Sequence, residues 1–286
     1  MSRGFFTIAQ GAAYQRLAYA LALSLRLSQP AELSRLSIGV AERELDEVPA
    51  RWREVFDQVV PIPWCDAAAQ STWKLENEWK SIYMSPYDET IKLDADMFFP
   101  ASIEGWWSVL EQGQATMVTA PVSYRGEQIT CDAYRRTFTE SELPNVYSAF
   151  FYFKKTPATY DFFKCCEFVF NNWQRCWYEY LGPAHRPTYF STDVAMAIAA
   201  KIQGLHELSA PPAAGVPTFV HMKSQLQGWP ALDATNEDWT QLVPTYFNKD
   251  CSLKIANYAQ LLPVHYYVKS FMTDRMIHLM EKKLGI

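Results

Sequence analysis

The chain has 286 residues, of which 49% are hydrophobic and 20% are charged, and its formal net charge is -5. This composition is ordinary for a globular protein and excludes disordered and fibrous classes. The acidic balance excludes a protein that coats nucleic acid or an anionic membrane by overall charge, but it leaves room for a local basic groove.

The cysteines and the amino-terminal residues indicate in which cellular compartment the protein is expected. Six cysteines are scattered without a CxxC pair, so neither a zinc knuckle nor a disulfide framework is indicated. Residues 1–10 lack the features of a secretory signal, and the apolar stretch 17–27 is shorter than the roughly 20 residues that span a bilayer. We expect a cytoplasmic protein without a membrane anchor.

The first third of the chain alternates between two hydrophobic periods. The patterns predict strands over 4–9, 36–40 and 55–62 and helices over 12–27 and 71–84. Such alternation is typical of α/β layers.

The middle of the chain continues this alternation. A strand over 89–93 runs directly into Asp94-Ala95-Asp96, and Pro100 opens a helix after it. The remaining predicted elements are strands over 116–122 and 146–153 and helices over 158–173 and 192–202.

The last third is less regular. We predict a short strand over 218–222 and a terminal amphipathic helix over 266–284. No internal repeat and no clear linker is evident, so we treat 1–286 as a single domain in which 230–286 is a C-terminal helical extension.

The pair Asp94 and Asp96 is the first candidate for chemistry. At the end of a strand the chain changes direction, so both carboxylates can face one cation, and hard divalent ions prefer oxygen ligands. A bound metal would neutralise the charge that develops on a diphosphate leaving group. A solvated turn after a strand gives the same short pattern, so the pair alone is not specific.

Four separated segments together form a more specific pattern. They are 6–16, 73–75, 91–97 and 219–223, the last followed by Gly228-Trp229. This pattern resembles the GT-A glycosyltransferases, and within them the retaining, glycogenin-like glycosyltransferase family 8. The resemblance covers roughly residues 4–229. It implies a nucleotide-sugar-binding α/β fold with a mostly parallel mixed sheet flanked by helices, and a UDP-sugar as the donor.

The resemblance also assigns positions in the opening segment. Ile8, Gln10, Gly11 and Tyr14 fall where members of the family contact the nucleoside. Tyr14 has an aromatic ring that can stack on a base, but a half-buried helix tyrosine would look the same in the sequence.

The other segments supply metal and diphosphate contacts by resemblance. Asp94, Ala95 and Asp96 match the metal-binding strand end, and His221 matches the third metal ligand. Two carboxylates and one imidazole suit Mn²⁺, or Mg²⁺, better than Ca²⁺. Lys223 is close to a position where the family has a cation.

Two further residues are catalytic candidates by resemblance. Lys74 corresponds to a lysine near the diphosphate and the sugar, and Asp193 to an acidic residue on the acceptor side. Asp193 would orient the acceptor or the anomeric centre, or serve as general base in an inverting enzyme. An exposed helix lysine and a helix-start aspartate are the alternatives. Asp132 is a weaker candidate for the same chemistry.

The chain also departs from the family pattern. Tyr147 and Ala149 stand where Asn and Gly are expected in a segment that touches the sugar, and Ser224 and Gln227 replace a small residue and a lysine. These departures leave the donor sugar and the stereochemistry open.

The sequence therefore predicts a metal-dependent glycosyltransferase, with a hexosyltransferase favoured. Because similar viral enzymes glycosylate hydroxymethylated pyrimidines in DNA, 5-hydroxymethylcytosine is the favoured acceptor, and a glycan or a protein hydroxyl is the alternative. A DNA acceptor needs a basic rim beside an exposed base. The candidates for that rim are Arg125, Arg135, Arg136, Lys154 and Lys155.

Two rival classes also fit paired carboxylates at a strand end. A nucleotidyltransferase is disfavoured because the chain has no glycine-rich phosphate loop and has His221 late in the sequence. A non-catalytic nucleotide-sugar-binding protein would keep the fold without the reaction.

Overall fold

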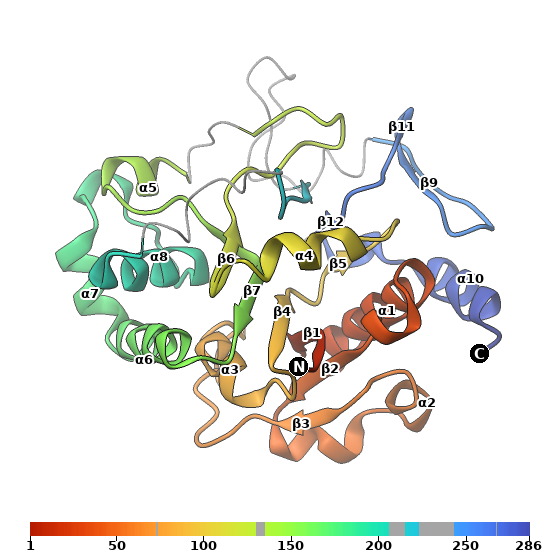
Figure 1. Ribbon diagram of the computed structural model, residues 1–286, viewed down its shortest axis with the longest axis horizontal. Coiled ribbons are helices and arrows are strands. Elements are labelled where there is room, and N and C mark those ends of the chain that lie inside the picture. Colours follow the sequence, from red (N-terminus) through yellow and green to blue (C-terminus); the bar gives the residue numbers. More distant parts are fainter. Residues whose placement is uncertain (73, 130–134, 206–214, 223–242, 267) are drawn as a thin grey trace.

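The computed structural model describes residues 1–72, 74–129, 135–205, 215–222, 243–266 and 268–286 (Figure 1). A six-stranded sheet with the order β3-β2-β1-β4-β7-β6 forms its centre. β1 to β4 run parallel, and β7 is antiparallel to both of its neighbours. This confirms the predicted mixed, mostly parallel sheet. The strands are β1 (Arg3–Ile8), β2 (Leu36–Val40), β3 (Val59–Pro61), β4 (Glu89–Leu93), β6 (Ala115–Val118) and β7 (Tyr147–Lys154).

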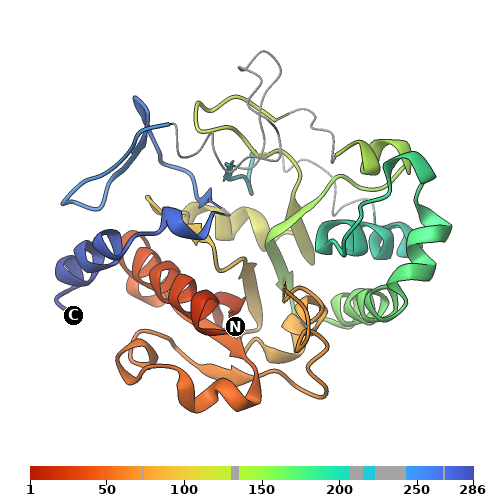
Figure 2. The same cartoon turned by 180° about the vertical axis from the view of Figure 1, so that it is seen from behind.

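Helices cover both faces of the sheet. Figures 1 and 2 show α1 with α10 on one side and α6, α7 and α8 on the other. The α-helices are α1 (Ala12–Ser28), α2 (Ala50–Arg53), α3 (Ser81–Met84), α4 (Trp107–Leu110), α5 (Arg136–Glu140), α6 (Pro157–Asn171), α7 (Trp173–Tyr180), α8 (Thr192–Gln203) and α10 (Asp274–Leu284). Short 3-10 helices lie at Ala31–Leu33, Glu42–Glu47, Glu78–Lys80, Glu104–Trp106, Pro183–His185 and Lys269–Phe271.

Besides the central sheet, the described residues form two small sheets. One has the order β5-β12-β8 and consists of β5 (Met97–Phe98), β12 (Val264–His265) and β8 (Val220–His221). The other is antiparallel and consists of β9 (Thr245–Phe247), β10 (Leu253–Ile255) and β11 (Tyr258–Ala259). The first joins the turn after β4 to two late segments of the chain, so it positions the site described below.

The core has two main parts, one on each face of the sheet. One contains most of α1 and the turn from β4 into β5, and the other contains the buried sides of α6 and α8. Among the described residues no helix is both long and apolar enough to cross a membrane.

Local signals explain the helix starts. Ser191 and Thr273 accept hydrogen bonds from the first turns of α8 and α10. Thr156 and Thr159 form a capping box at α6, whose first residue is Pro157. α1 follows Gly11, whose φ of 84° favours glycine.

The structure corrects the predicted helix over 71–84. Among the described residues of this range, only Ser81–Met84 is α-helical, and it is preceded by the 3-10 turn Glu78–Lys80. Lys74 has a φ of 58°, which an α-helix does not allow, and Asn77 bonds to Asp66 through side chains at 2.7 Å. The side-chain hydrogen bonds of Asn77 to Asp66 and Gln10 therefore hold this loop beside the end of β1.

The carboxyl-terminal region also differs from its prediction. The terminal helix begins at Asp274 rather than at 266, because Thr273 caps it. Within 230–286, which the sequence suggests is a helical extension, the described residues contain β9 to β12 as well as α10. Short strands of two or three residues leave too weak a periodicity to be recognised.

Gly4 lies where β1 passes the ring of Tyr87, and a methyl group added to Gly4 would collide with that ring. The Tyr87 hydroxyl hydrogen-bonds with Ser37 Oγ at 2.8 Å and Asp57 Oδ2 at 2.9 Å, so the ring is not free to move away. We predict that Gly4→Ala lowers the free energy of unfolding by about 1–3 kcal/mol in urea denaturation. Gly105→Ala is the control because an added methyl there meets no atom within 4 Å apart from the adjacent chain, and an equal loss in both variants would contradict the argument.

Candidate functional site

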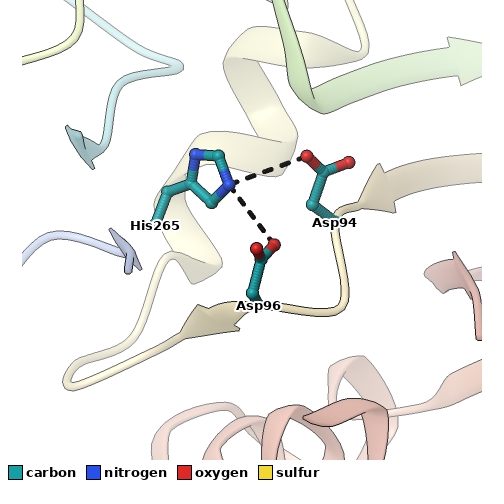
Figure 3. Close-up of side chains that lie close together, drawn as sticks. All are labelled: Asp94, Asp96 and His265. Atoms are coloured by element: carbon teal, nitrogen blue, oxygen red, sulfur yellow. Dashed lines mark ion pairs between the residues drawn. The ribbon is translucent and has the colours of Figure 1, made fainter. Parts of the chain in front are cut away.

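Three ligand-type side chains converge at the carboxyl end of β4. His265 Nε2 lies 3.3 Å from Asp96 Oδ1 and 3.7 Å from Asp94 Oδ2 (Figure 3). Each of the three offers one potential ligand atom, and these atoms all lie within 4.8 Å of one another. Among the acidic, histidine and cysteine side chains of the described residues, Asp94, Asp96 and His265 are the group close enough together to hold one metal ion.

Backbone pairing brings these residues together. The Asp94 amide donates to Ala149 O on β7 at 3.0 Å, and the Tyr266 amide donates to Asp96 O at 3.1 Å. β5 begins directly after Asp96 and pairs with β12 so that Met97 lies opposite His265. The sheet and the β5-β12 pair thus fix both ends of the acidic turn.

His221, the histidine expected from the sequence, lies beside this group. β8 pairs with β12 so that His221 is opposite His265, and the two ring centroids are 5.3 Å apart. His221 is buried and packs edge-on against Tyr147 at 5.5 Å. His221 does not belong to the three-residue group with 4.8 Å spacing.

His265 is a site residue that sequence reasoning missed. The segments around His221 and His265 look alike, because each histidine follows a short apolar run and has a lysine within four residues after it. The resemblance selected the first of the two. Only the pairing of β12 with β5 shows which one faces the carboxylates.

A buried ion pair lies behind Asp94. Lys92 on β4 is 1% exposed, and its Nζ donates to Asp94 Oδ1 at 2.8 Å. The same ammonium forms a shorter ion pair with Glu78 Oε2, which is also buried. Lys92 therefore bridges a core carboxylate and a carboxylate of the candidate site.

Burial and charge act in opposite directions on these groups. Burial raises the pKa of Glu78 to about 7, even though Lys92 lowers it. Burial also favours a high pKa for Asp96, but the facing His265, a backbone hydrogen bond and Lys92 together outweigh it, and the pKa of Asp96 falls below its usual value. Burial disfavours charge on Lys92, yet the two carboxylates raise its pKa well above the ordinary value.

The segment after β1 lies at the same edge of the sheet. Gln10 is buried, and its side-chain amide donates to both Asp66 oxygens at 3.0 Å and accepts from Asn77 at 2.8 Å. The Gly11 amide donates to Glu44 at 2.8 Å. Because β1 and β4 are parallel neighbours, this loop and the acidic turn emerge side by side.

The other two residues of the predicted nucleoside-binding segment differ in exposure. Ile8 is buried in a small cluster with Phe6, Ile62 and Met84. Tyr14 is half-buried, and the Lys269 ammonium lies 4.0 Å from its ring centroid. A cation thus covers one aromatic surface beside the loop.

Lys74 and Lys223 are the lysines expected near the diphosphate. Lys74 Nζ donates to the carbonyls of Ala68 and Ala69 at 2.8 and 2.9 Å. Lys223 lies outside the described residues, as do Asp132, Ser224 and Gln227. Ala95, between the two acids, is buried.

Asp193 lies in the first turn of α8 and has every oxygen engaged. Oδ1 accepts from the amide and the hydroxyl of Ser148 at 2.8 and 2.6 Å, and Oδ2 pairs with Arg135 at 2.7 Å. Burial acts to raise the pKa of Asp193, but Arg135 and Ser148 outweigh it and lower the pKa. A carboxylate held in this way is suited to orienting neighbours rather than to accepting a proton.

Three of the five cations considered for a DNA-binding rim, Arg135, Lys154 and Lys155, are engaged within the fold. Arg135 is buried against Asp193, and Lys154 and Lys155 donate to the carbonyls of Glu111 and Ser85. Because β7 is antiparallel to β4, its last residue, Lys154, pairs with Glu89, the first residue of β4. Lys154 therefore lies at the end of β4 opposite to the acidic turn. Arg135, Lys154 and Lys155 therefore do not line one surface.

Comparison with known proteins gives a likeness at the level of structure. No protein-family profile matches the chain, and no curated protein sequence matches it. An active-site mutant of LgtC matches with a TM-score of 0.53 and 14% identity over 98% of this chain and 95% of that one. Mouse xyloside xylosyltransferase 1, apo form, has a TM-score of 0.48 and 11% identity over 96% of this chain and 100% of that one. The likeness to LgtC shows that this chain has the GT-A glycosyltransferase fold.

The contacts of Asp193 predict an acid-dependent loss of stability. Folding lowers the pKa of Asp193, so its ionised form stabilises the folded state. This stabilisation is fully present above the pKa of the unfolded chain, about 4, and is lost as the pH falls through the lower pKa of the folded state. We predict that wild type has a higher free energy of unfolding than Asp193→Asn at pH 6, and that this difference becomes smaller as the pH is lowered to 3. Urea denaturation at both pH values measures it, and a difference that stays constant or widens would argue against the ion pair.

Proposed function

We propose that the protein is a metal-dependent glycosyltransferase that transfers a sugar, a hexose in the first instance, from a UDP-sugar to a hydroxyl acceptor. The observation that carries the proposal is the convergence of Asp94, Asp96 and His265 at the carboxyl end of β4. In open α/β sheets, ligands bind outside the carboxyl ends of the strands. The GT-A fold supplies the context for a nucleotide-sugar.

The donor set fits a divalent cation. Two carboxylates and one imidazole form a mixed oxygen and nitrogen site, which suits Mn²⁺ and also accommodates Mg²⁺. When bound, such an ion neutralises the negative charge that develops on a diphosphate leaving group. We propose His265 as the third ligand, with His221 packed behind it.

The neighbouring residues have roles that follow from their contacts. The backbone around Gln10 and Gly11 and the ring of Tyr14 would hold the uridine, since they lie beside the acidic turn. Asp193 would orient the acceptor side through Ser148 and Arg135. Lys74 would reach the diphosphate only by leaving the carbonyls of residues 68 and 69, so its catalytic role is the first to be tested.

The cellular location is a separate part of the proposal. The described cysteines Cys65, Cys165, Cys166, Cys176 and Cys251 are free thiols. Free thiols are typical of a reducing compartment. We propose that the enzyme acts in the cytoplasm.

Metal binding and turnover test the site. We expect Asp96→Ala to abolish Mn²⁺-dependent release of UDP from UDP-glucose, because it removes a ligand, while thermal unfolding stays cooperative. His265→Ala should reduce turnover by more than the roughly 10- to 100-fold that is typical of residues behind a ligand, and His221→Ala by no more than that. His278→Ala, at an exposed position on α10, is the matched control.

The same assay separates the rival classes. If UTP and glucose 1-phosphate, supplied in place of UDP-glucose, yield pyrophosphate, the protein is a nucleotidyltransferase, whereas binding of UDP-glucose without turnover would indicate a non-catalytic protein. If His221→Ala were more damaging than His265→Ala, the assignment of the third ligand would be reversed.

For the acceptor we propose a direct comparison. Duplex DNA containing 5-hydroxymethylcytosine is the first candidate, and glycans and protein hydroxyls are the alternative. The dispersed positions of Arg135, Lys154 and Lys155 offer no support for the DNA acceptor. Incubation with UDP-glucose and Mn²⁺, followed by mass spectrometry, should show a gain of one hexose on a single class of acceptor, and a gain on glycan or protein alone would reject DNA.

A further inference from the structure

We infer that Glu78 and Lys92 are charge-balancing positioning residues for the metal site: Glu78 offsets the charge of Lys92, so that Asp94 keeps its own charge for a divalent cation. The inference rests on the proposed function, because it assigns a role to two residues behind the same three ligands. Both residues are buried, and both act through Asp94.

The geometry divides the two oxygens of Asp94 between different tasks. Oδ1 accepts from the Lys92 ammonium at 2.8 Å, on the buried side, and Oδ2 faces His265 Nε2 at 3.7 Å. The Asp94 side chain is 30% exposed, whereas those of Lys92 and Glu78 are 1% and 8% exposed. Lys92 therefore fixes the rotation of the carboxylate and leaves one oxygen for a cation.

The local charges match one divalent ion. Glu78, Asp94 and Asp96 are three carboxylates in the same cluster as a single ammonium, so the ionised cluster carries two negative charges. Without the charge of Glu78, the cluster would carry one. Because a buried charge pair is screened only weakly, an uncompensated ammonium next to Asp94 would repel an incoming cation and compete for Asp94.

A second buried lysine shows that a buried lysine in this fold does not need carboxylate partners. Lys80, two residues after Glu78, is also 1% exposed, yet its ammonium donates to the backbone carbonyls of Pro63 and Cys65. Carbonyl oxygens are thus sufficient to hold a buried lysine here. Lys92 instead has a carboxylate on each side, one of them in the candidate site.

A charge-deletion cycle tests the inference. The variants are Glu78→Gln, the double variant Glu78→Gln/Lys92→Met and, as a control, Lys80→Met. Mn²⁺ affinity is measured at pH 8, where Glu78 is ionised, by electron paramagnetic resonance of free Mn²⁺ and by calorimetry without nucleotide. This readout is independent of turnover.

The expected pattern is a loss followed by a recovery. Glu78→Gln keeps the shape of the side chain and leaves Lys92 unbalanced, so Mn²⁺ affinity should fall on the order of tenfold. The double variant removes the charges of Glu78 and Lys92 and leaves those of Asp94 and Asp96, so the cluster again carries two negative charges. Its Mn²⁺ affinity should therefore return to within about threefold of wild type. Lys80→Met should bind Mn²⁺ as wild type does.

The other outcomes are distinguishable. If the pair were only structural, Glu78→Gln and the double variant would lose Mn²⁺ binding alike, and that result overturns the inference. Unchanged affinity in Glu78→Gln overturns it as well. If wild type does not bind Mn²⁺ at all, the proposed function fails together with the inference, whereas Mn²⁺ binding that is equal in wild type and both variants rejects the inference alone.

Discussion

The ammonium of Lys92 lies beneath the turn that carries Asp94 and Asp96, and most of the site geometry follows from its position. It is buried on β4 between Glu78 and Asp94, so it joins a 3-10 turn from outside the sheet to the end of a central strand. A buried ion pair by itself contributes little net stability because desolvation opposes it. Its effect here is to orient: the Asp94 carboxylate is fixed in rotation, with one oxygen turned toward His265.

The sheet provides the second constraint. β1 and β4 are parallel neighbours, so the loop containing Gln10 and Gly11 and the acidic turn end at one edge. The Asp94 amide is bonded to Ala149 on β7, and the amide of the preceding residue, Ser148, is bonded to Asp193. Adjacent residues of β7 therefore connect the carboxylate proposed for the metal with the one proposed for the acceptor side.

The sequence predicted the parts of this arrangement that depend on local signals. The hydrophobic run of β4 that leads into Asp94, the long helix after Gly11 and the start of α8 at Thr192 could all be recognised. His265 could not, because a two-residue strand such as β12 has no detectable period and is defined by its pairing with β5. The sequence placed Lys92 within the metal-binding segment but did not show that it is buried between two acids. One of those acids is Glu78, which lies in the range 71–84 that the hydrophobic pattern wrongly predicted to be one helix.

Tyr147 shows how a departure from the family pattern fits the rest of the site. The resemblance noted in the sequence leads us to expect an asparagine here, whereas the centroid of the Tyr147 ring lies 3.3 Å from the Arg135 guanidinium carbon and the ring packs edge-on against His221 at 5.5 Å. His221 in turn packs against His265, whose centroid is 5.3 Å away. The larger side chain thus fills the space between the Asp193 ion pair and the histidine pair. Because aromatic contacts of this kind fix ring orientation, Tyr147 limits how far His221 can rotate, and through His221 it limits the rotation of His265, the proposed third ligand.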